Sequence, residues 1–458
     1  MSASGTQAVD VVVVGAGLAG LACAHELQST GASVVVLERE PRAGGRVRLG
    51  EVDGCPIDLG AHFLSPRYAT VRRLIGAAGL ESRVRSLAPS YATAILRDGR
   101  WHHIDYGRPL SVARFSAVSL PQRARLALMA LPVARTARTL RFFDVASAAA
   151  VDARDPARLV GDDALRYVLA PVSQAFCGYG RDDVTLPLLS IGARFPLRAP
   201  LTLEGGLGQL GPALASRLPV RCATAVDELS VGGRDGVVVR AHGSGGELRF
   251  VARAAVVATT PSAALRVWPG APTPVRDFLA SCAYTHHFHA YLRTDSSFAP
   301  TSPRGDPLYM EIVPGGESSG VLSHVSFAAG SSVADGGLVF VAARSRAVAA
   351  EADDERLAGQ LQDELERIHP QLRGRVVARR SIRWTEKVPR FPPGHTRAVA
   401  AFRRSLTPGP VDLAGDYLYG PLMEGAAQSG VAAARRVAAY LAASPRPVSV
   451  STPREVVA

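Results

Sequence analysis

The fold is decided by residues 11–38, which read Val11-Val-Val-Val14-Gly15-Ala-Gly17-Leu-Ala-Gly20-Leu-Ala-Cys-Ala-His-Glu-Leu-Gln28-Ser-Thr-Gly31-Ala-Ser33-Val-Val-Val-Leu37-Glu38. The apolar runs 11–14 and 33–37 predict two buried strands of a parallel sheet. Residues 18–28 predict a helix that ends before Gly31. A strand, a helix and a second strand in this order predict a right-handed crossover unit.

The glycines between the first strand and the helix have the spacing of a dinucleotide-binding turn. Gly15 permits the tight turn, Gly17 lets a pyrophosphate approach the backbone, and Gly20 lets the helix pack closely on the strand. The helix start offers unpaired N–H groups and a positive dipole end to the pyrophosphate. Glu38 ends the second strand, where a carboxylate accepts ribose hydroxyls and disfavours the extra phosphate of NADP. A glycine turn in an unrelated α/β fold is the alternative interpretation.

Further motifs select a flavin. They are Arg39-Glu-Pro-Arg-Ala-Gly44-Gly45-Arg46, Gly60-Ala61-His62-Phe63, Gly415-Asp416 and Met423-Glu424-Gly425-Ala426. At these residues the chain resembles the flavin amine oxidase superfamily, which includes monoamine oxidases, protoporphyrinogen oxidase and phytoene-desaturase-like enzymes. The resemblance implies FAD bound by Gly15, Ala16, Gly17, Ala19, Gly20, Glu38, Arg39, Gly44, Gly45, Arg46, Gly60, Ala61, His62, Phe63, Val226, Gly415, Asp416, Met423, Glu424, Gly425 and Ala426.

Two central stretches, 203–218 and 383–395, are similar to protoporphyrinogen-oxidase-like members of this superfamily. Amine oxidases of the superfamily carry two aromatic rings at the flavin; here the matching positions fall beside Lys387 and at Leu422, so that cage is expected to be absent. The family lysine that holds a water at the flavin would fall near His287, where this chain has none. No cysteine is close to Lys387 in the sequence, which predicts noncovalent FAD.

The predicted fold class is α/β, with a discontinuous Rossmann-like FAD-binding domain and an inserted α+β substrate domain. The spacing of strands after residue 220 predicts a β-meander, and the region around 428–442 predicts a final helix. The FAD-binding domain is expected in residues 1–86, 204–265 and 395–458, and the substrate domain in residues 87–203, largely helical, and 266–394.

Composition narrows the class of protein. The chain has 458 residues, is 47% hydrophobic and carries a net charge of +12, so it can bury a large core and is compatible with an anionic ligand. No long run of like charges predicts a nucleic-acid tail, and no apolar stretch is long enough to span a membrane. The polar N-terminus and the scattered cysteines predict a cytoplasmic protein with reduced thiols, and no Cys/His spacing predicts a metal site.

Two residues are candidates for catalysis. If residues 284–291 form a strand, His287, His289 and Tyr291 share one face, and His287 could act as a base near the flavin. The alternative is a sheet face with hydrogen-bonded histidines. Lys387 is the only lysine in the chain, and its ammonium could stabilise reduced flavin or bind an acid group. The alternative is a solvated loop charge.

An arginine-rich segment between residues 108 and 141 has two interpretations. Leucines and phenylalanines alternate with Arg108, Arg114, Arg123, Arg125, Arg135, Arg138 and Arg141. These residues could form a peripheral membrane surface that admits an apolar substrate. Ordinary amphipathic helices with solvated arginines are the favoured alternative.

The resemblance implies an FAD-dependent oxidase or desaturase that acts on a fairly large apolar small molecule in biosynthesis or secondary metabolism. The reaction is expected to be oxidation at CH–CH or CH–NH, and the missing cage favours CH–CH. A flavin-dependent isomerase or cyclase without net oxidation, an amine oxidase, and a flavin-bound structural protein are the alternatives. Substrate identity, electron acceptor and oligomeric state are open at this point.

Overall fold

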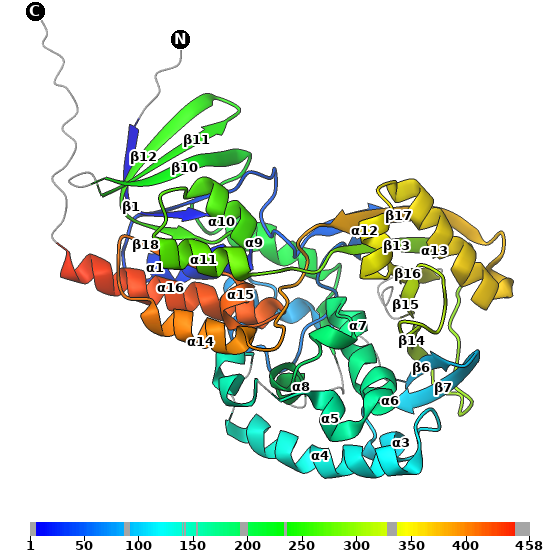
Figure 1. Ribbon diagram of the computed structural model, residues 1–458. Coiled ribbons are helices and arrows are strands. Elements are labelled where there is room, and N and C mark those ends of the chain that lie inside the picture. Colours follow the sequence, from blue (N-terminus) through cyan, green and yellow to red (C-terminus); the bar gives the residue numbers. More distant parts are fainter. Residues whose placement is uncertain are drawn as a thin grey trace, which may run out of the picture.

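The computed structural model describes residues 6–86, 92–139, 141, 143–152, 154–192, 200–232, 236–327 and 337–444. Two large sheets organise this part of the chain, and Figure 1 shows them side by side with a layer of helices below. The first sheet has the strand order β10-β11-β12-β1-β2-β9, with β18 paired to β12. The second has the order β17-β13-β16-β15-β14-β6-β7. The mixture of parallel and antiparallel pairs confirms the predicted α/β class.

The centre of the first sheet is the predicted crossover unit. Strand β1 (Thr6–Val14) pairs in parallel with β2 (Val34–Leu37) and β12 (Gly246–Val257), and Val11–Val14 are at most 3% exposed. Helix α1 (Leu18–Gln28) has the predicted limits. Beyond β12 lies the predicted meander. The remaining strands of this sheet are β9 (Val220–Arg221), β10 (Thr224–Gly232), β11 (Gly236–Gly243) and β18 (Val411–Leu413).

Helix α16 (Met423–Ala443) packs against α1, and the two lie together below the sheet in Figure 1. Contact this close needs a glycine, because a Cβ at Gly430 would lie 2.0 Å from the Ala19 carbonyl oxygen. The prediction that this helix starts at Gln428 is wrong, since it already begins at Met423. The glycine-rich start joins the helix because Gly425 packs onto Gly420, whose oxygen would lie 2.3 Å from an added Cβ.

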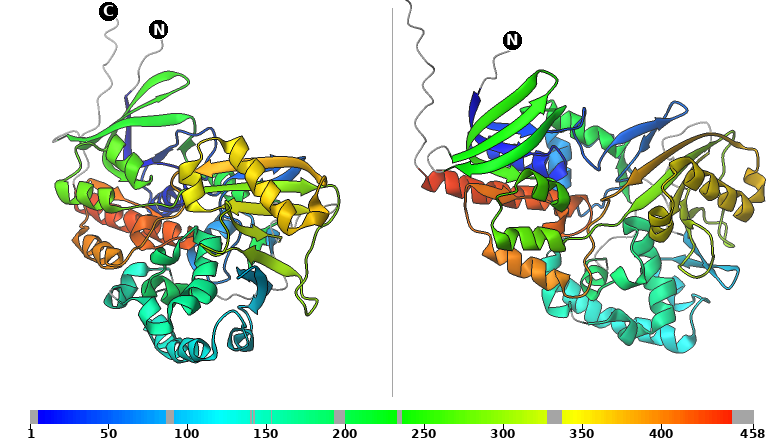
Figure 2. Two further views of the ribbon diagram at one scale, coloured as in Figure 1. Left: turned by 45° about the vertical axis from the view of Figure 1, so that its right-hand side comes forward. Right: turned by 45° about the horizontal axis from the view of Figure 1, so that its top comes forward.

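The second sheet is covered on one face by α12 (Ser345–Ala350) and α13 (Asp354–Ile368), as the two views of Figure 2 show. Leucines of α13 form a core with apolar side chains of the strands. The strands of this sheet are β6 (Ala92–Arg97), β7 (Arg100–Asp105), β13 (His287–Thr294), β14 (Leu308–Ile312), β15 (Leu322–Ser326), β16 (Leu338–Ala343) and β17 (Val376–Trp384).

The segment 87–203 is less purely helical than the sequence predicts. Strands β6 and β7 form a hairpin whose turn residues, Asp98 and Gly99, have φ of +50° and +72°. Positive φ at both positions is the geometry of a tight hairpin turn, which Asp-Gly favours. The helices of this segment are α3 (Pro109–Ala113), α4 (Leu120–Thr139), α5 (Pro156–Val160), α6 (Asp162–Ala164), α7 (Ala170–Cys177) and α8 (Leu186–Gly192).

The first sheet draws its strands from segments 1–86, 204–265 and 395–458, and the second from 87–203 and 266–394. The domain boundaries themselves stay a prediction. Shorter elements complete the part of the chain described: β3 (Leu49–Val52), β4 (Cys55–Asp58), α2 (Ala69–Ala77), β5 (Val84–Ser86), β8 (Leu201–Leu203), α9 (Leu210–Ala215), α10 (Pro261–Val267), α11 (Thr273–Ser281), α14 (His395–Ser405) and α15 (Asp416–Tyr419).

The arginine-rich segment builds α3 and α4. Leu126 and Met129 of α4 are buried in a local core, which agrees with an amphipathic helix. Most of the large apolar side chains that stay exposed in the described residues lie nearby: Leu110, Leu120, Leu128 and Leu159. Both interpretations of this surface therefore stay predictions. Among the described residues no helix has the length and hydropathy to cross a membrane.

Candidate active site

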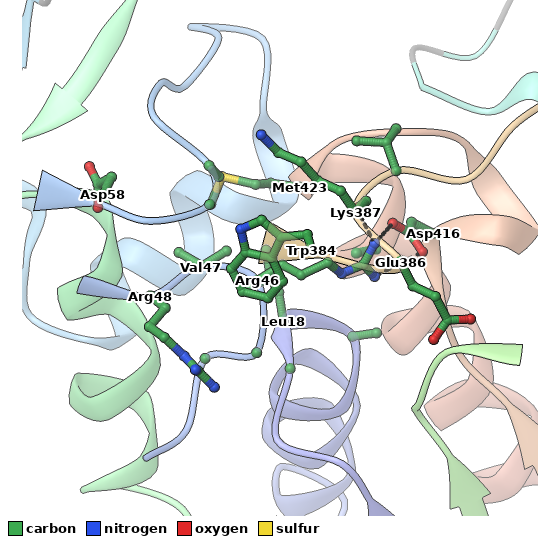
Figure 3. Close-up of a pocket in the computed structure, with 18 of the residues that line it drawn as sticks. Leu18, Arg46, Val47, Arg48, Asp58, Trp384, Glu386, Lys387, Asp416 and Met423 are labelled. Carbon is green, nitrogen blue, oxygen red and sulfur yellow. Dashed lines mark hydrogen bonds and ion pairs between the residues drawn. The ribbon is translucent and has the colours of Figure 1, made fainter. Parts of the chain in front are cut away.

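A cavity of about 840 Å³ lies between the two sheets and is lined by residues of both. We call its two parts the glycine half and the histidine half. Figure 3 shows residues where the halves meet. The glycine half comprises Gly15, Gly17, Glu38, Gly44, Gly45, Val226 and their neighbours in the first sheet. The histidine half comprises His62, Phe63, Phe176, Tyr291, Tyr309, Met310, His324, Ser326, Phe340, Lys387 and Leu422.

Glycine backbone forms a cradle at the start of α1. Gly15 and Gly44 have φ of +101° and +122°, which glycine adopts without strain. Gly17 forms an isolated bridge with Gly44, and the Gly44 N–H donates to the Ala16 carbonyl at 2.9 Å. A Cβ added at Gly17 would meet no atom within 4 Å, although Gly17 lines the cavity. The cradle therefore leaves room for a ligand to lie against bare backbone.

Two helices begin at this cavity. The N-cap of α1 is Gly17 and that of α16 is Leu422, and neither makes a side-chain capping hydrogen bond. The first N–H groups of both helices therefore remain available to an anionic or oxygen-bearing ligand. Leu422 has φ +86° and ψ 169°, a conformation that costs a non-glycine residue of order 1–3 kcal/mol.

Glu38 is fixed at the end of β2. Its carboxylate accepts the N–H of Ala16 at 2.8 Å and that of Glu40 at 2.9 Å. Although only 8% exposed, Glu38 lines the cavity, so its remaining lone pairs face the ligand space. Val226 of β10 lines the same half, next to a bulge in the pairing of β10 with β11. This end suits the ribose and adenine of a dinucleotide.

An ion pair between two segments of the first sheet lies where the halves meet, and it contacts residues 284 and 387 of the segment that builds the second sheet. Arg46 donates to both carboxylate oxygens of Asp416, at 2.7 and 3.1 Å, and to the Lys387 carbonyl at 2.7 Å (Figure 3). Tyr284 donates its hydroxyl to Asp416 at 2.6 Å, and its ring lies 5.4 Å from the Arg46 guanidinium. The nearby carboxylate raises the pKa of Arg46 above its usual range, against the effect of burial. Arg46 also lines the cavity, so its predicted contact with FAD stays a prediction.

The residues of the glycine half fit FAD. The open space at Gly17 fits a pyrophosphate, and the uncapped helix starts fit an oxygen-bearing edge of the flavin ring. The Glu38 carboxylate fits a ribose. When bound there, FAD would supply a hydride acceptor and a route for electrons to a second substrate.

Four histidine rings gather at the other end. His287, His289 and Tyr291 follow each other along one face of β13, with adjacent ring centroids 5.4 and 5.7 Å apart, which confirms the predicted shared face. His62 and His324 reach the same cluster from the loop before α2 and from β15. Burial lowers the pKa of His62 and of His324 to about 3, and lowers the pKa of the other two well below the usual range.

Lys387 belongs to the wall of the histidine half rather than to a solvated loop. The backbone N–H of Lys387 donates to the Thr285 carbonyl at 3.0 Å, which fixes the backbone beside the start of β13. In Figure 3 its ammonium extends away from Glu386, whose carboxylate accepts from Thr260 and Ser262. Burial lowers the pKa of Lys387 to about 7. The ammonium in turn lowers the pKa of all four histidines.

Most of the predicted cofactor residues line the cavity. They are Gly15, Gly17, Ala19, Glu38, Arg39, Gly44, Gly45, Arg46, Gly60, Ala61, His62, Phe63, Val226, Gly415, Asp416, Met423 and Ala426. Ala16, Gly20 and Gly425 do not line it: the Ala16 carbonyl accepts the Gly44 N–H, and the two glycines pack on Gly15 and Gly420 respectively. The Glu424 carboxylate accepts the N–H groups of Thr70 and Val71, so it caps α2 rather than facing the cavity.

His287 does not line the cavity. It is 3% exposed, and its Nε2 has no hydrogen-bond partner among the described residues. A base must reach the proton that it removes, so this placement speaks against the predicted role. His324 on β15 occupies the wall instead. The only feature of the sequence that could have predicted this role for His324 is its position in a short strand with alternating apolar residues.

Several other wall residues carry no sequence motif. Phe340, Tyr309, Met310 and Phe176 line the histidine half, and Trp384 donates its indole N–H to the Leu59 carbonyl at 2.8 Å. The fold also brings a cysteine near Lys387, which the sequence did not predict: Cys177, at the end of α7, is close enough to interact with the lysine. Cys177 is 8% exposed, and burial raises the pKa of its thiol to about 12. The described residues contain no group of ligands suited to a metal ion.

Comparisons with known proteins bear on the family and the fold of this chain. The family model described as flavin containing amine oxidoreductase matches residues 18–438. A putative flavin-containing monoamine oxidase, AofH, of Mycobacterium tuberculosis is 44% identical over 92 residues, which cover 20% of this chain and 18% of that protein. The flavin-dependent L-tryptophan oxidase RebO of Lentzea aerocolonigenes is 37% identical over 101 residues, or 21% and 20% of the two chains. These alignments thus span about a fifth of the relatives' length.

Solved structures share the whole architecture. Wild-type putrescine oxidase bound to putrescine has a TM-score of 0.75 at 18% identity, over 95% of this chain and 100% of that one. Cyclohexylamine oxidase from Brevibacterium oxydans has a TM-score of 0.72 at 22% identity, over 95% and 99%. At such identities the likeness concerns the fold alone.

Proposed function

The chain belongs to the flavin-containing amine oxidoreductase family, and we propose that it is an FAD-dependent oxidase that desaturates a fairly large apolar small molecule. The substrate loses two hydrogens from adjacent carbons, one as a hydride and one as a proton, and becomes an alkene. Oxygen is the expected final acceptor and would leave as hydrogen peroxide. We further propose that FAD is held without a covalent bond.

The apolar character of the wall of the histidine half is the main support for this proposal. Its side chains are mainly aromatic or apolar, and Leu422 stands where the resemblance would place the second ring of an aromatic cage. None of the carboxylates that line the cavity is among the side chains of the histidine half. Asp58 accepts the N–H groups of Leu207 and Gly208, Asp416 accepts from Arg46, and Glu386 accepts from Thr260 and Ser262. A cationic amine bound in the histidine half would therefore find no carboxylate among those side chains, whereas an apolar chain would replace water there.

The residues of the chain have three tasks in this reaction. Glycine backbone and Glu38 bind the dinucleotide, the Arg46–Asp416 pair holds the segment 266–394 through the Lys387 carbonyl and the Tyr284 hydroxyl, and the aromatic wall orients the substrate and excludes water. Proton removal needs a base within reach of the substrate. His324 is on the wall, and burial lowers its pKa to about 3, so the ring is unprotonated at neutral pH but accepts a proton less readily than an ordinary imidazole.

A stopped-flow experiment under nitrogen tests the proposed function. A panel of apolar small molecules is mixed with the FAD-loaded protein, and loss of flavin absorbance reports hydride transfer. Bleaching, followed by peroxide when air is admitted and by a product two hydrogens lighter at carbon, supports the proposal. Bleaching by amines alone would identify an amine oxidase. Turnover without bleaching or mass change would identify an isomerase, and both outcomes overturn the proposed desaturation.

A further inference from the structure

Lys387 is the starting point for naming a substrate class. Among the described residues its ammonium makes no ion pair and no hydrogen bond, although it lines a largely apolar cavity wall. Most arginines that line the cavity are paired with a carboxylate, among them Arg46 with Asp416, Arg48 with Glu40 and Arg383 with Asp354. Arg266 has no such pair among the described residues, but it belongs to α10 beside the first sheet and not to the histidine half. A cation left without a counter-charge in such a wall is costly unless a ligand supplies one.

The surroundings of Lys387 offer it no negative charge. The side chains that interact with it electrostatically are His62 of the loop before α2, His287 and His289 of β13, His324 of β15 and Cys177 at the end of α7. The four histidines are neutral at neutral pH because their pKa values are lowered by burial, and Cys177 keeps its proton because burial raises the pKa of its thiol to about 12. Glu386 is turned toward Thr260 and Ser262. Lys387 is therefore the charge that decides which ligands this half prefers.

We propose that the histidine half binds an apolar organic acid, with the carboxylate of the acid paired to the ammonium of Lys387. The apolar part of the acid lies against the aromatic wall formed by Phe63, Phe176, Tyr309 and Phe340. This inference rests on the proposed function in that it takes the acid to be the substrate. The overall charge of +12 agrees with it, because a positive protein attracts an anion over distance.

The charge of the ligand has opposite consequences for an acid and an amine. A carboxylate stabilises the protonated form of Lys387 and gains a charge-assisted hydrogen bond. An ammonium ligand would meet a like charge in a wall of low polarity, where repulsion is strong. The same wall therefore favours acids and rejects amines through one residue.

Equilibrium binding of a matched series of probes tests this inference. Phenylbutyrate, its amide and phenylbutylamine share one apolar body and differ in charge. Their dissociation constants for the oxygen-free, FAD-loaded protein are measured from the perturbed flavin spectrum and by calorimetry. We expect phenylbutyrate to bind at least 10-fold tighter than the other two. Equal binding of the three probes, tighter binding of the amine, or no binding at millimolar concentration would overturn the inference.

Variants of Lys387 separate its charge from its volume. Lys387→Met should weaken phenylbutyrate by about 10- to 150-fold, the range for one charge-assisted hydrogen bond, and should leave the amide unchanged. Lys387→Arg keeps the charge and should restore most of the affinity. A retained flavin spectrum in each variant shows that the protein is folded and loaded. If Lys387→Met shifts only the flavin potential and phenylbutyrate binds as before, the lysine serves the cofactor and the inference fails.

The pH dependence gives an independent readout. Burial raises the pKa of Asp58, which also lines the cavity, to about 6, so its charge changes little above about pH 7. From there to about pH 9 neither the four histidines nor Cys177 titrates in the folded protein, so Lys387 dominates the change. Affinity for phenylbutyrate should fall as pH rises through the range near 7 where the lysine loses its proton. The profile of Lys387→Arg should be flat over this range. If acids bind with this profile but no acid bleaches the flavin, the substrate class stands and the desaturase proposal fails.

Discussion

In the glycine half of the cavity the charged groups Glu38, Arg46 and Asp416 have partners within the protein, whereas at the other end Lys387 and His289 have none among the described residues. Glu38 accepts two backbone N–H groups, and Arg46 and Asp416 hold each other at the boundary. At the other end Lys387 has no counter-charge, and both ring nitrogens of His289 are buried without a hydrogen bond. The difference indicates that the first half is organised before any ligand binds, and that the second half is completed by its ligand.

The largest effect is expected where the two halves meet. Arg46→Met leaves Asp416 buried without its cation, which should lower the free energy of unfolding by about 3–5 kcal/mol. Urea unfolding at two FAD concentrations separates this loss from any change in ligand binding. As a control, Arg240→Met removes an exposed pair with Glu228 and should cost about 1 kcal/mol or less. Equal decreases in the free energy of unfolding of the two variants would show that the Arg46–Asp416 pair does not stabilise the fold more than an exposed ion pair does.

The next effect tests the organisation of the glycine half. Glu38→Ala removes the ribose acceptor and frees the N–H groups of Ala16 and Glu40. FAD affinity should fall about 10- to 150-fold, which corresponds to about 1.5–3 kcal/mol. Flavin fluorescence titration of the FAD-depleted protein measures it. An unchanged affinity, or a preference for NADPH, would contradict the assignment of this half to FAD.

The histidine half should make stability depend on pH. The pKa of His324 is about 3 in the folded protein and near 6.5 in an unfolded chain, so the unfolded state takes up the proton first. Its contribution to stability is complete above pH ~6.5 and is lost as pH falls toward 3, at about 1.4 kcal/mol per pH unit. Denaturation of His324→Leu between about pH 6 and pH 4 should show a correspondingly shallower decline. Parallel profiles for parent and variant would mean that this ring is not buried neutral.

The smallest effect has the opposite sign to the others. His289→Phe replaces a ring with two unsatisfied nitrogens by an apolar ring, and should raise the free energy of unfolding by up to about 1 kcal/mol. Tyr284→Phe is the matched control at the boundary. It removes the hydroxyl that donates to Asp416 and should lower the same quantity by about 1.5–3 kcal/mol. Urea unfolding of both variants gives the two signs directly, and a loss in both would mean that His289 has a partner in solution.

Parts of the candidate site could be predicted because their chemistry is local. The turn at Gly15 and Gly17 needs glycine for its φ and its open face, and these needs leave a mark at fixed spacing. The resemblance implies that Glu424 binds the cofactor, but in the structure its carboxylate accepts the first N–H groups of α2. The alternation of side chains along the strand predicts which residues share a face with His287, but it does not predict which histidine reaches the cavity. That depends on the strands that pack around β13.

The sequence by itself determined the crossover unit, the limits of α1, the meander and the dinucleotide site, because hydrophobic period and glycine spacing act over a few residues. Only the tertiary structure decided the hairpin of β6 and β7 within a segment expected to be helical, the pairing of Arg46 with Asp416, and the position of Lys387 among four histidines. Arg46 and Asp416 are 370 positions apart, and β13 and β15 bring in histidines from separate strands. Such contacts depend on how segments far apart in the sequence pack together, which no local pattern of side chains records.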